Sequence, residues 1–208
     1  MAQYFEVHPE TPQQRLIHQA VKILAEGGVV AYPTDSSYAL GCRMGDKAAV
    51  DRIREIRRLE SEHNFTLACK DLKDIGIYAK MENYAYRLLK SHTPGPYTFI
   101  LRATREVPRR LQHPKRKTIG IRVPDHRTCQ ALLKAFEEPL MSVTLQLPGD
   151  ELPLNDPEAI YHRIGKQIDA VIAGGATGGG ASTVVDLTGE AAEVVREGVG
   201  DTRVFQHA

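Results

Sequence analysis

The spacing of apolar positions predicts that the chain opens with a helix followed by a buried strand. From Thr11 the sequence has a capping-box pattern with proline at the first helical position, and apolar residues then recur at helical spacing as far as Leu24. Gly27 and Gly28 end this predicted helix. The apolar run over 29–32 is typical of a buried strand, and the polar segment over 34–41 predicts a loop.

The rest of the chain alternates between these two patterns. Helices are predicted after Asp46 as an N-cap and over 81–91, 126–137 and 156–167, and strands over 65–69, 97–101, 118–123, 140–145, 170–173, 183–187 and 193–195. Such alternation is typical of helices layered on a sheet, and hairpin-like spacing near the C-terminal end indicates a mixed sheet. We therefore expect an α/β fold, a single domain over residues 1–208 with helices flanking a mixed parallel and antiparallel sheet.

The composition is that of an ordinary globular protein and excludes several classes. Of 208 residues, 42% are hydrophobic and 25% charged. The sequence contains neither a run of about 18 apolar residues nor a basic and apolar leader. We therefore expect a soluble, cytoplasmic protein with no membrane partner. Cys42, Cys69 and Cys129 lie far apart without metal-ligand spacing, so neither a disulfide framework nor a metal site is predicted.

The formal net charge of +1 conceals a strongly basic middle segment. Residues 50–127 hold 18 Lys and Arg against 9 Asp and Glu, whereas the remainder holds 9 against 17. Over 102–122 Glu106 alone opposes the basic residues Arg102, Arg105, Arg109, Arg110, Lys115, Arg116, Lys117 and Arg122. A face that gathered these side chains would attract phosphate, so we expect a phosphate-bearing ligand, a nucleotide or RNA. The alternative is a solvated loop in which they serve solubility.

The segment over 174–183 is the most glycine-dense in the chain, and it leads into a strand. A P-loop and a dinucleotide fingerprint both need a following helix, so neither applies. What remains is either a loop whose backbone approaches a ligand, with Ser182 at its exit, or a flexible surface turn. No HExxH pair, GxSxG elbow or cysteine–histidine pairing of familiar spacing is present, and no catalytic residue is singled out.

Five segments, taken in order, carry a resemblance to a known family. They are Tyr32–Gly41, Pro94–Leu101, Gly120–Pro124, Gly174–Leu187 and Val195–Gly198. Each is weak alone, but the ordered set covers nearly the whole chain and resembles the YrdC/YciO family. The resemblance implies a twisted mixed sheet around a large basic depression. It also implies the reaction of the best-known members, which make threonylcarbamoyl-AMP from threonine, bicarbonate and ATP, releasing pyrophosphate, for a tRNA adenosine modification.

Carried over to matching positions, the resemblance implies a set of ligand contacts. Thr34 would touch the amino acid and Arg122 its carboxylate, with Asn64 and Thr66 also assigned to the substrate. The nucleotide contacts would be Arg57, Arg58, Thr144, Gln146, Ser182 and Arg196. ATP would arrive as a substrate with Mg²⁺, and no prosthetic group is implied. From the residues alone, Thr34 could instead cap the strand exit, and the two strand arginines could be ion-paired.

Two segments depart from the synthase members and resemble the YciO branch. Arg57-Arg58 stand where synthases carry a Lys-x-Arg element, and arginine presents a planar fork in place of a compact ammonium. Thr144 and Gln146 stand where synthases have Ser-x-Asn, each with one extra side-chain carbon. The hydrogen-bonding groups of these two segments are therefore expected to lie in shifted positions relative to those of the synthases.

An alternative from another class is a non-catalytic protein that binds double-stranded RNA or tRNA. Its phosphate contacts would be the basic loop residues Arg105, Arg109, Arg110, Lys115, Arg116 and Lys117, and its affinity would fall steeply with salt. A third alternative is a hydrolase or acyltransferase of another carbamoylated or adenylated small molecule. In each case we expect a monomer or a weak dimer.

Overall fold

The computed structural model describes residues 1–60 and 62–206, and within them the chain forms one sheet and six α-helices. The helices are α1 (Gln14–Ala25), α2 (Lys47–Arg57), α3 (Leu72–Tyr78), α4 (Asn83–His92), α5 (Arg127–Phe136) and α6 (Pro157–Ile164), with short 3-10 helices η1 (Arg109–Leu111) and η2 (Arg203–Phe205). The strands are β1 (Gln3–Glu6), β2 (Val30–Pro33), β3 (Tyr38–Arg43), β4 (Thr66–Ala68), β5 (Ala79–Lys80), β6 (Tyr97–Ala103), β7 (Thr118–Arg122), β8 (Leu140–Thr144), β9 (Ala170–Ala173), β10 (Thr183–Asp186) and β11 (Glu193–Arg196).

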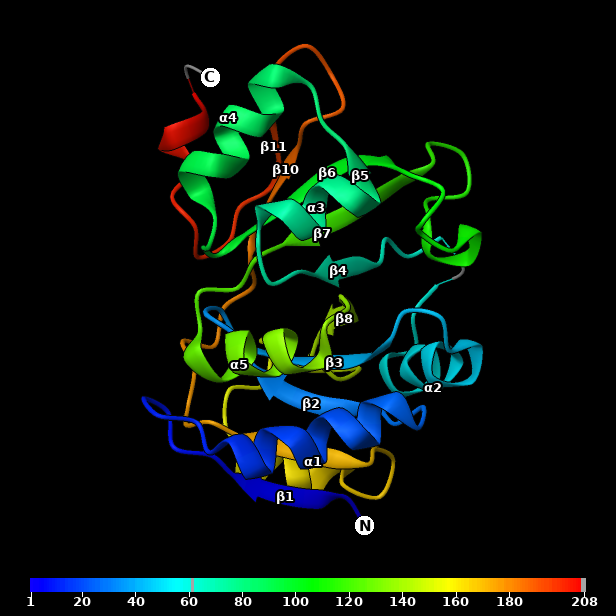
Figure 1. Ribbon diagram of the computed structural model, residues 1–208, viewed down its shortest axis with the longest axis vertical. Helices are drawn as coiled ribbons and strands as arrows, with labels where there is room; N and C mark the ends of the chain where they lie inside the picture. The colour runs from blue at the N-terminus through cyan, green and yellow to red at the C-terminus, as the bar shows by residue number, and fades with distance from the viewer. Residues whose placement is uncertain (61, 207–208) are drawn as a thin grey trace.

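The eleven strands of the described chain make a single mixed sheet (Figure 1). Its order is β1-β9-β2-β3-β8-β4-β7-β6-β10-β11, and β5 pairs with β6 beside this path. β9 is parallel to β1 and β2, whereas β4 is parallel to β7 and antiparallel to β8. The C-terminal strands β10 and β11 pair antiparallel, as their spacing predicts. The predicted mixed α/β architecture is confirmed, and the single domain over 1–208 stays a prediction.

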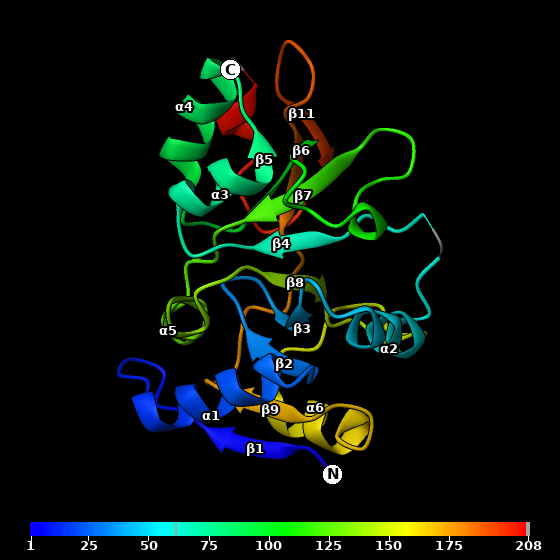
Figure 2. The same ribbon diagram turned by 45° about the vertical axis from the view of Figure 1, so that its right-hand side comes forward.

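Helices cover the two sides of the twisted sheet unequally. Figure 2 shows α1 and α5 on one side of its lower half and α2 and α6 on the other, with α3 and α4 packed at the upper end. In α1 the buried residues Ile17, Ala20 and Leu24 recur at helical spacing and pack on the sheet with Leu132 of α5. This packing fixes the central strands that carry the site.

Two predicted helix caps are confirmed. The Asp46 side chain accepts a hydrogen bond from the Ala49 amide at 2.9 Å and begins α2. At α6, Asp156 accepts from the amides of Glu158 and Ala159, with proline in the first turn. The first cap matters for the site because α2 carries Arg57 at its far end.

The prediction of a loop over 34–41 is wrong in its second half. Residues 38–43 form β3, which pairs antiparallel with β2 and β8 and is buried along most of its length. The sequence of this segment gave no strand signal, because the strand is held in place by its pairing with β2 and β8. At Gly41, for example, a Cβ atom would lie 2.7 Å from the Tyr32 ring, so only glycine fits beside that side chain.

The predicted cap at Thr11 is also wrong, since α1 begins at Gln14 with Gln13 as its N-cap. The Thr11 hydroxyl instead lies 3.0 Å from Nδ1 of His8 in a hydrogen bond. Local bonding of this kind competes with capping. The sequence pattern also missed the short elements β1, β5, α3, η1 and η2.

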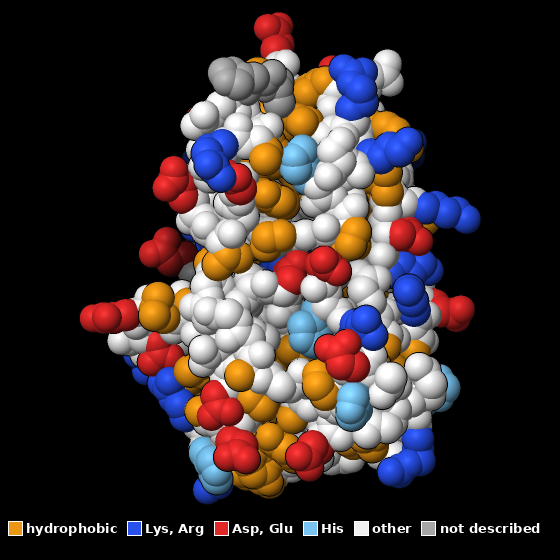
Figure 3. All heavy atoms as spheres, turned by 90° about the vertical axis from the view of Figure 1, so that its left-hand side faces the viewer, with side chains coloured by type: hydrophobic (Ala, Val, Ile, Leu, Met, Phe, Trp, Pro, Cys, Tyr) orange, Lys and Arg blue, Asp and Glu red, His pale blue; other side chains and the backbone are white. Residues whose placement is uncertain are grey.

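Charged side chains of both signs are interspersed on the face that Figure 3 shows. Within the described ranges, the structure contains no helix of the length and apolar character needed to cross a membrane.

Candidate functional site

A cavity of about 300 Å³ opens on one face of the sheet, where small residues replace bulky ones. The strand register places Ile100, Gly120, Thr66 and Ser142 in one row across β6, β7, β4 and β8. Directly paired residues share a face, and all four line the cavity. Phe99, the residue before Ile100 on β6, faces the other side of the sheet and belongs to the hydrophobic core. The volume is in the range of small-ligand sites.

Hydroxyl groups line much of this cavity. The hydroxyls of Thr98 and Ser182 lie 2.7 Å apart in a buried hydrogen bond that joins β6 to the start of β10. Thr34 donates to the Ser37 carbonyl at 2.6 Å and accepts from the Ser37 amide at 3.3 Å. Thr34 therefore caps the turn between β2 and β3, which was the alternative to a ligand contact, and it also lines the cavity.

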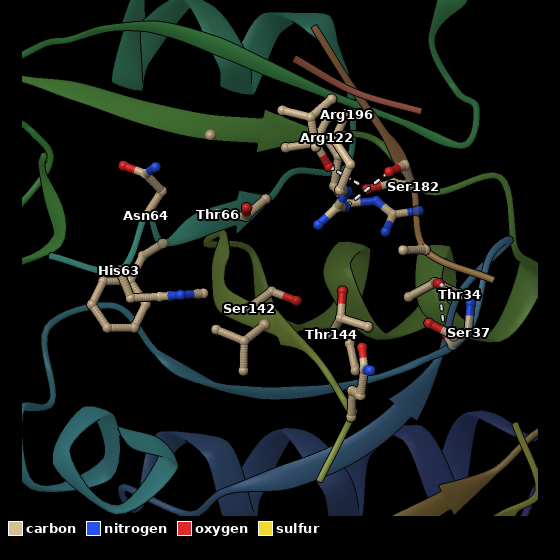
Figure 4. Close-up of a pocket in the computed structure, with 18 of the residues that line it drawn as sticks. Thr34, Ser37, His63, Asn64, Thr66, Arg122, Ser142, Thr144, Ser182 and Arg196 are labelled. Carbon is tan, nitrogen blue, oxygen red and sulfur yellow. Dashed lines mark hydrogen bonds between the residues drawn. The ribbon is translucent and has the colours of Figure 1, made fainter. Parts of the chain in front are cut away.

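Three arginines from three separate elements reach the cavity: Arg57 of α2, Arg122 of β7 and Arg196 of β11. Figure 4 shows the guanidinium groups of Arg122 and Arg196 directed into it. Arg196 donates to the Ser182 carbonyl at 2.8 Å. Among the described residues that line the cavity there is no aspartate or glutamate. The wall is therefore positive and suited to an anion.

A buried ion pair holds Arg122 in place. Its side chain is 8% exposed, and it donates to the Asp35 carboxylate and, at 3.3 Å, to the Ser36 hydroxyl. The other Asp35 oxygen accepts from the Asp125 amide at 2.7 Å. Asp35 thus ties the turn after β2 to the end of β7 and balances one of the three arginine charges.

The other two arginines are less buried than Arg122, and their guanidinium groups have lowered pKa values. Burial lowers the pKa of the Arg57 guanidinium, and burial together with the charge of Arg122 lowers the pKa of Arg196. On the same cavity wall, burial and then the charges of Arg57, Arg54 and Arg196 lower the pKa of His63 to about 4. Its imidazole is neutral near pH 7. A bound anion would oppose each of these shifts.

The glycine-rich segment forms a loop that hydrogen bonds to Tyr38 hold in place, and it leads to the cavity. Tyr38 donates to the Gly175 carbonyl at 2.7 Å and accepts from the Gly174 amide at 3.2 Å. Gly175 and Gly179 have φ of 92° and 75°, values that disfavour residues with a side chain. The loop then delivers Ser182, which is 3% exposed, to the cavity wall. These bonds argue against a flexible surface turn.

The fold brings most of the predicted contact residues to this one cavity. Those that line it are Thr34, Arg57, Asn64, Thr66, Arg122, Thr144, Gln146, Ser182 and Arg196. Arg58 differs from them because it follows α2 as its C-cap in the left-handed conformation, with φ of 50°, and is exposed. It does not line this cavity, but it lines an adjoining hollow together with Arg57, His63 and Asn64.

The predicted RNA contacts do not line the cavity either. Arg105, Arg109, Arg110, Lys115, Arg116 and Lys117 belong to η1 and the segments around it between β6 and β7. Arg116 pairs with Asp186 at 2.5 Å, and Arg110 donates to the Gly45 carbonyl at 2.7 Å. Of the basic residues over 102–122, the cavity receives Arg122 alone. Its positive wall is therefore not built by the basic loop.

The structure shows what replaces the Ser-x-Asn pattern of the synthases. The Gln146 amide donates to the Asp150 carbonyl at 2.9 Å, and its main-chain oxygen accepts from Arg57. One N–H of this side-chain amide is therefore engaged by the following turn, and its second N–H and its oxygen remain for other partners. Figure 4 shows that the Asn64 amide also points away from the other labelled side chains.

Sequence reasoning did not identify four polar residues of the cavity: Ser37, His63, Thr98 and Ser142. Thr98 and Ser142 did leave a signal, since each is a polar residue inside an apolar strand run. His63 left none, because it lies in an irregular segment whose path only the fold determines.

Comparison with known proteins shows the family of this chain. Residues 22–198 match the Sua5, YciO and YrdC family, which carries the description telomere recombination. YciO of Escherichia coli (strain K12) is 55% identical over 205 residues, which cover 99% of this chain and 100% of that protein. The crystal structure of E. coli YciO superposes with a TM-score of 0.96 over the same shares of the two chains.

Two more distant relatives have printed activities or ligands. Threonylcarbamoyl-AMP synthase of Chromobacterium violaceum is 35% identical over 144 residues, which cover 69% of this chain and 74% of that protein. The crystal structure of P. abyssi Sua5 complexed with L-threonine is 27% identical with a TM-score of 0.87, and the match covers 94% of this chain and 57% of that one. The threonine-bound relative thus shares the fold of nearly the whole chain.

Proposed function

The chain belongs to the Sua5, YciO and YrdC family, and on this premise we propose that its cavity binds L-threonine and ATP and forms threonylcarbamoyl-AMP. One observation carries the proposal: Arg57, Arg122 and Arg196 converge from three elements on one hydroxyl-lined cavity whose described lining residues include no carboxylate. Such a cavity suits a ligand with a phosphate chain and a carboxylate.

The amino-acid end would lie beside Thr34, Ser37 and Arg122. Figure 4 shows these three side chains at the same end of the cavity, with Ser182 close by. A guanidinium held by Asp35 can offer its remaining donor surface to the threonine carboxylate, and neighbouring hydroxyls can bond the amino acid's own hydroxyl. The crystal structure of P. abyssi Sua5 complexed with L-threonine supports threonine as the ligand.

The phosphates would extend toward Arg57, with Arg196 between the two ends. In the proposed reaction the threonine amine and bicarbonate give a carbamate and water. A carbamate oxygen then attacks the α-phosphorus of ATP, and the bond to the pyrophosphate oxygen breaks. Guanidinium groups in a partly desolvated site stabilise the charge that gathers on the phosphorus oxygens. The adenylate product would serve the tRNA adenosine modification that the family resemblance implies.

A magnesium ion would accompany ATP through the triphosphate and not through protein ligands. The described lining of the cavity offers hydroxyls, amides and cations, whereas Mg²⁺ bound by a protein prefers carboxylates. The residues present therefore fit a metal that the nucleotide carries with it, since the phosphates and water can supply its oxygen ligands.

The test of the proposal is direct synthesis. Protein incubated with L-threonine, bicarbonate, ATP and MgCl₂ is expected to release threonylcarbamoyl-AMP and pyrophosphate, measured by chromatography and a pyrophosphate assay. Product at the level of a protein-free blank would sink the proposal. Because the Gln146 amide is engaged by Asp150, we expect turnover below that of a synthase with Ser-x-Asn.

The ATP affinities of two arginine variants, one inside the cavity and one outside it, provide a matched comparison. Arg196→Gln removes a charged donor from the cavity and is expected to weaken ATP binding by about 10- to 100-fold. Arg87→Gln removes an exposed arginine of α4 that does not line the cavity, so its ATP affinity should equal that of the unsubstituted protein. Calorimetric titration measures both, and equal losses in the two variants would contradict the assignment.

A further inference from the structure

His63 occupies a position that none of the assigned contacts accounts for. It follows α2 by six residues and lines the cavity together with Arg57 and Asn64. Figure 4 shows its imidazole pointing into the cavity from the end opposite Thr34 and Ser37. On the proposed function, this is the end toward which the phosphate chain extends.

The His63 ring packs against Phe65, which in turn packs against Arg54. The His63 and Phe65 rings meet edge to face with centroids 5.6 Å apart, and the Arg54 guanidinium lies 4.6 Å from the Phe65 centroid. The His63 amide donates to the Glu60 carbonyl at 3.1 Å. Its ring nitrogens make no hydrogen bond within the described chain, so they remain available to a ligand in the cavity.

The charges that lower the pKa of this imidazole are those of Arg57 and Arg54 from α2 and of Arg196 from β11. Arg58, Glu60 and Glu62 line an adjoining hollow with His63, and none of them contributes a resolved shift. Burial and the three arginine charges lower the pKa of His63 to about 4, which keeps the ring neutral in the free protein near pH 7. An anion between Arg57 and Arg196 would cancel part of that repulsion. It would also offer an acceptor to a protonated ring.

We propose that His63 is a phosphate-contacting residue that takes up a proton when the phosphate chain of ATP binds. This inference rests on the proposed function and adds a proton-linked contact to it. The sign follows from the two states: the ring is neutral in the free protein and protonated beside the anion. Binding should therefore gain strength as the pH falls through the pKa of His63 in the complex.

Proton uptake measures the effect. A neighbouring anion raises a histidine pKa by about 1–3 units, so at pH 6 we expect about 0.5 proton more per ATP bound to the natural chain than to His63→Gln. Calorimetry in two buffers of different ionisation enthalpy counts these protons. Protonation of ATP itself is common to both proteins and cancels. From pH 8 to pH 5 the affinity ratio of natural chain to variant should rise about tenfold.

His18→Gln is the matched control, because His18 is exposed on α1 and does not line the cavity. It should show the proton uptake of the natural chain. A second measurement avoids dependence on the His63→Gln fold: proton NMR of the natural chain, with the His63 signal assigned through its contact with the Phe65 ring. Its pKa should rise on addition of ATP.

Two failures are distinguishable. If ATP binds but the natural chain and His63→Gln take up equal numbers of protons, or the NMR pKa of His63 does not move, this inference is overturned and the proposed function stands. If ATP does not bind the natural chain at any pH tested, the proposed function fails and the inference fails with it.

Discussion

At the scale of single residues, the site depends on a few buried charges. Asp35 joins two distant segments by accepting from Arg122 and from the Asp125 amide, and both charged side chains are at most 10% exposed. In a buried ion pair, loss of one partner leaves the other charge unpaired in a poor solvent. The pair is therefore a condition both for stability and for the direction in which Arg122 points.

Asp35→Asn tests this dependence. We expect the free energy of unfolding to fall by about 3–5 kcal/mol and threonine binding to weaken, because an uncompensated guanidinium remains buried. Urea denaturation measures the first effect and calorimetry the second. Asp51→Asn is the control: its partner Lys47 lies in an exposed pair on one helix, so the change should stay within about 0.5 kcal/mol. Equal effects in the two variants would show that burial of the Asp35 pair does not matter.

At the scale of elements, close backbone contacts position Ser182 and Arg196. The segment after β11 returns to the start of β10, where the Val199 amide donates to the Ala181 carbonyl at 2.9 Å and the Gly198 amide donates to the Thr183 hydroxyl at 3.0 Å. A Cβ atom on Gly198 would lie 2.3 Å from the Ala181 carbonyl oxygen and 2.5 Å from the Ser182 backbone. Only glycine allows this approach.

Gly198→Ala is therefore expected to lower the free energy of unfolding by about 1–3 kcal/mol and to weaken ATP binding, since the backbone at Ser182 must move. Gly189→Ala, in the turn before β11, provides the comparison because its Cβ atom would lie an ordinary 3.8 Å from the Ala191 carbonyl oxygen. Thermal denaturation and an ATP titration of both variants check the difference. A stable, fully binding Gly198→Ala protein would refute the packing argument.

At the scale of the whole molecule, the arginines of the cavity and the basic residues predicted to contact RNA lie in two separate places. Arg57, Arg122 and Arg196 line the cavity, whereas the predicted RNA contacts lie around η1 between β6 and β7. Nucleotide binding and any phosphate binding by the basic loop should therefore be separable by mutation. The two hypotheses formed from the sequence need not compete for one surface.

The double substitution Arg105→Gln with Lys115→Gln checks this separation. Both residues are exposed and lie outside the cavity, so ATP affinity should not change. If double-stranded RNA binds the loop, its affinity should fall, and the slope of log affinity against log salt should flatten by up to about 2. Filter binding over a salt series measures the slope, and an affinity for RNA that is independent of salt would reject phosphate-driven binding.

The sequence by itself determined most of the helices and strands and many of the residues that line the cavity. Strong local signals such as the Asp46 cap, the apolar run of β6 and the Asp156-Pro157 helix start needed no tertiary help. The family segments likewise indicated Thr34, Arg122, Ser182 and Arg196 as cavity residues. These features are local in the chain, or are carried by segments that can be read one at a time.

Tertiary structure decided what local signals do not encode. β3 is a strand because β2 and β8 pair with it, and Arg58 lies outside the main cavity, where α2 ends in a left-handed turn. His63 enters the cavity, and the basic loop lies outside it, through the path of the chain alone. Strand pairing and burial are set by contacts between residues far apart in sequence, so they arise only when the chain is folded.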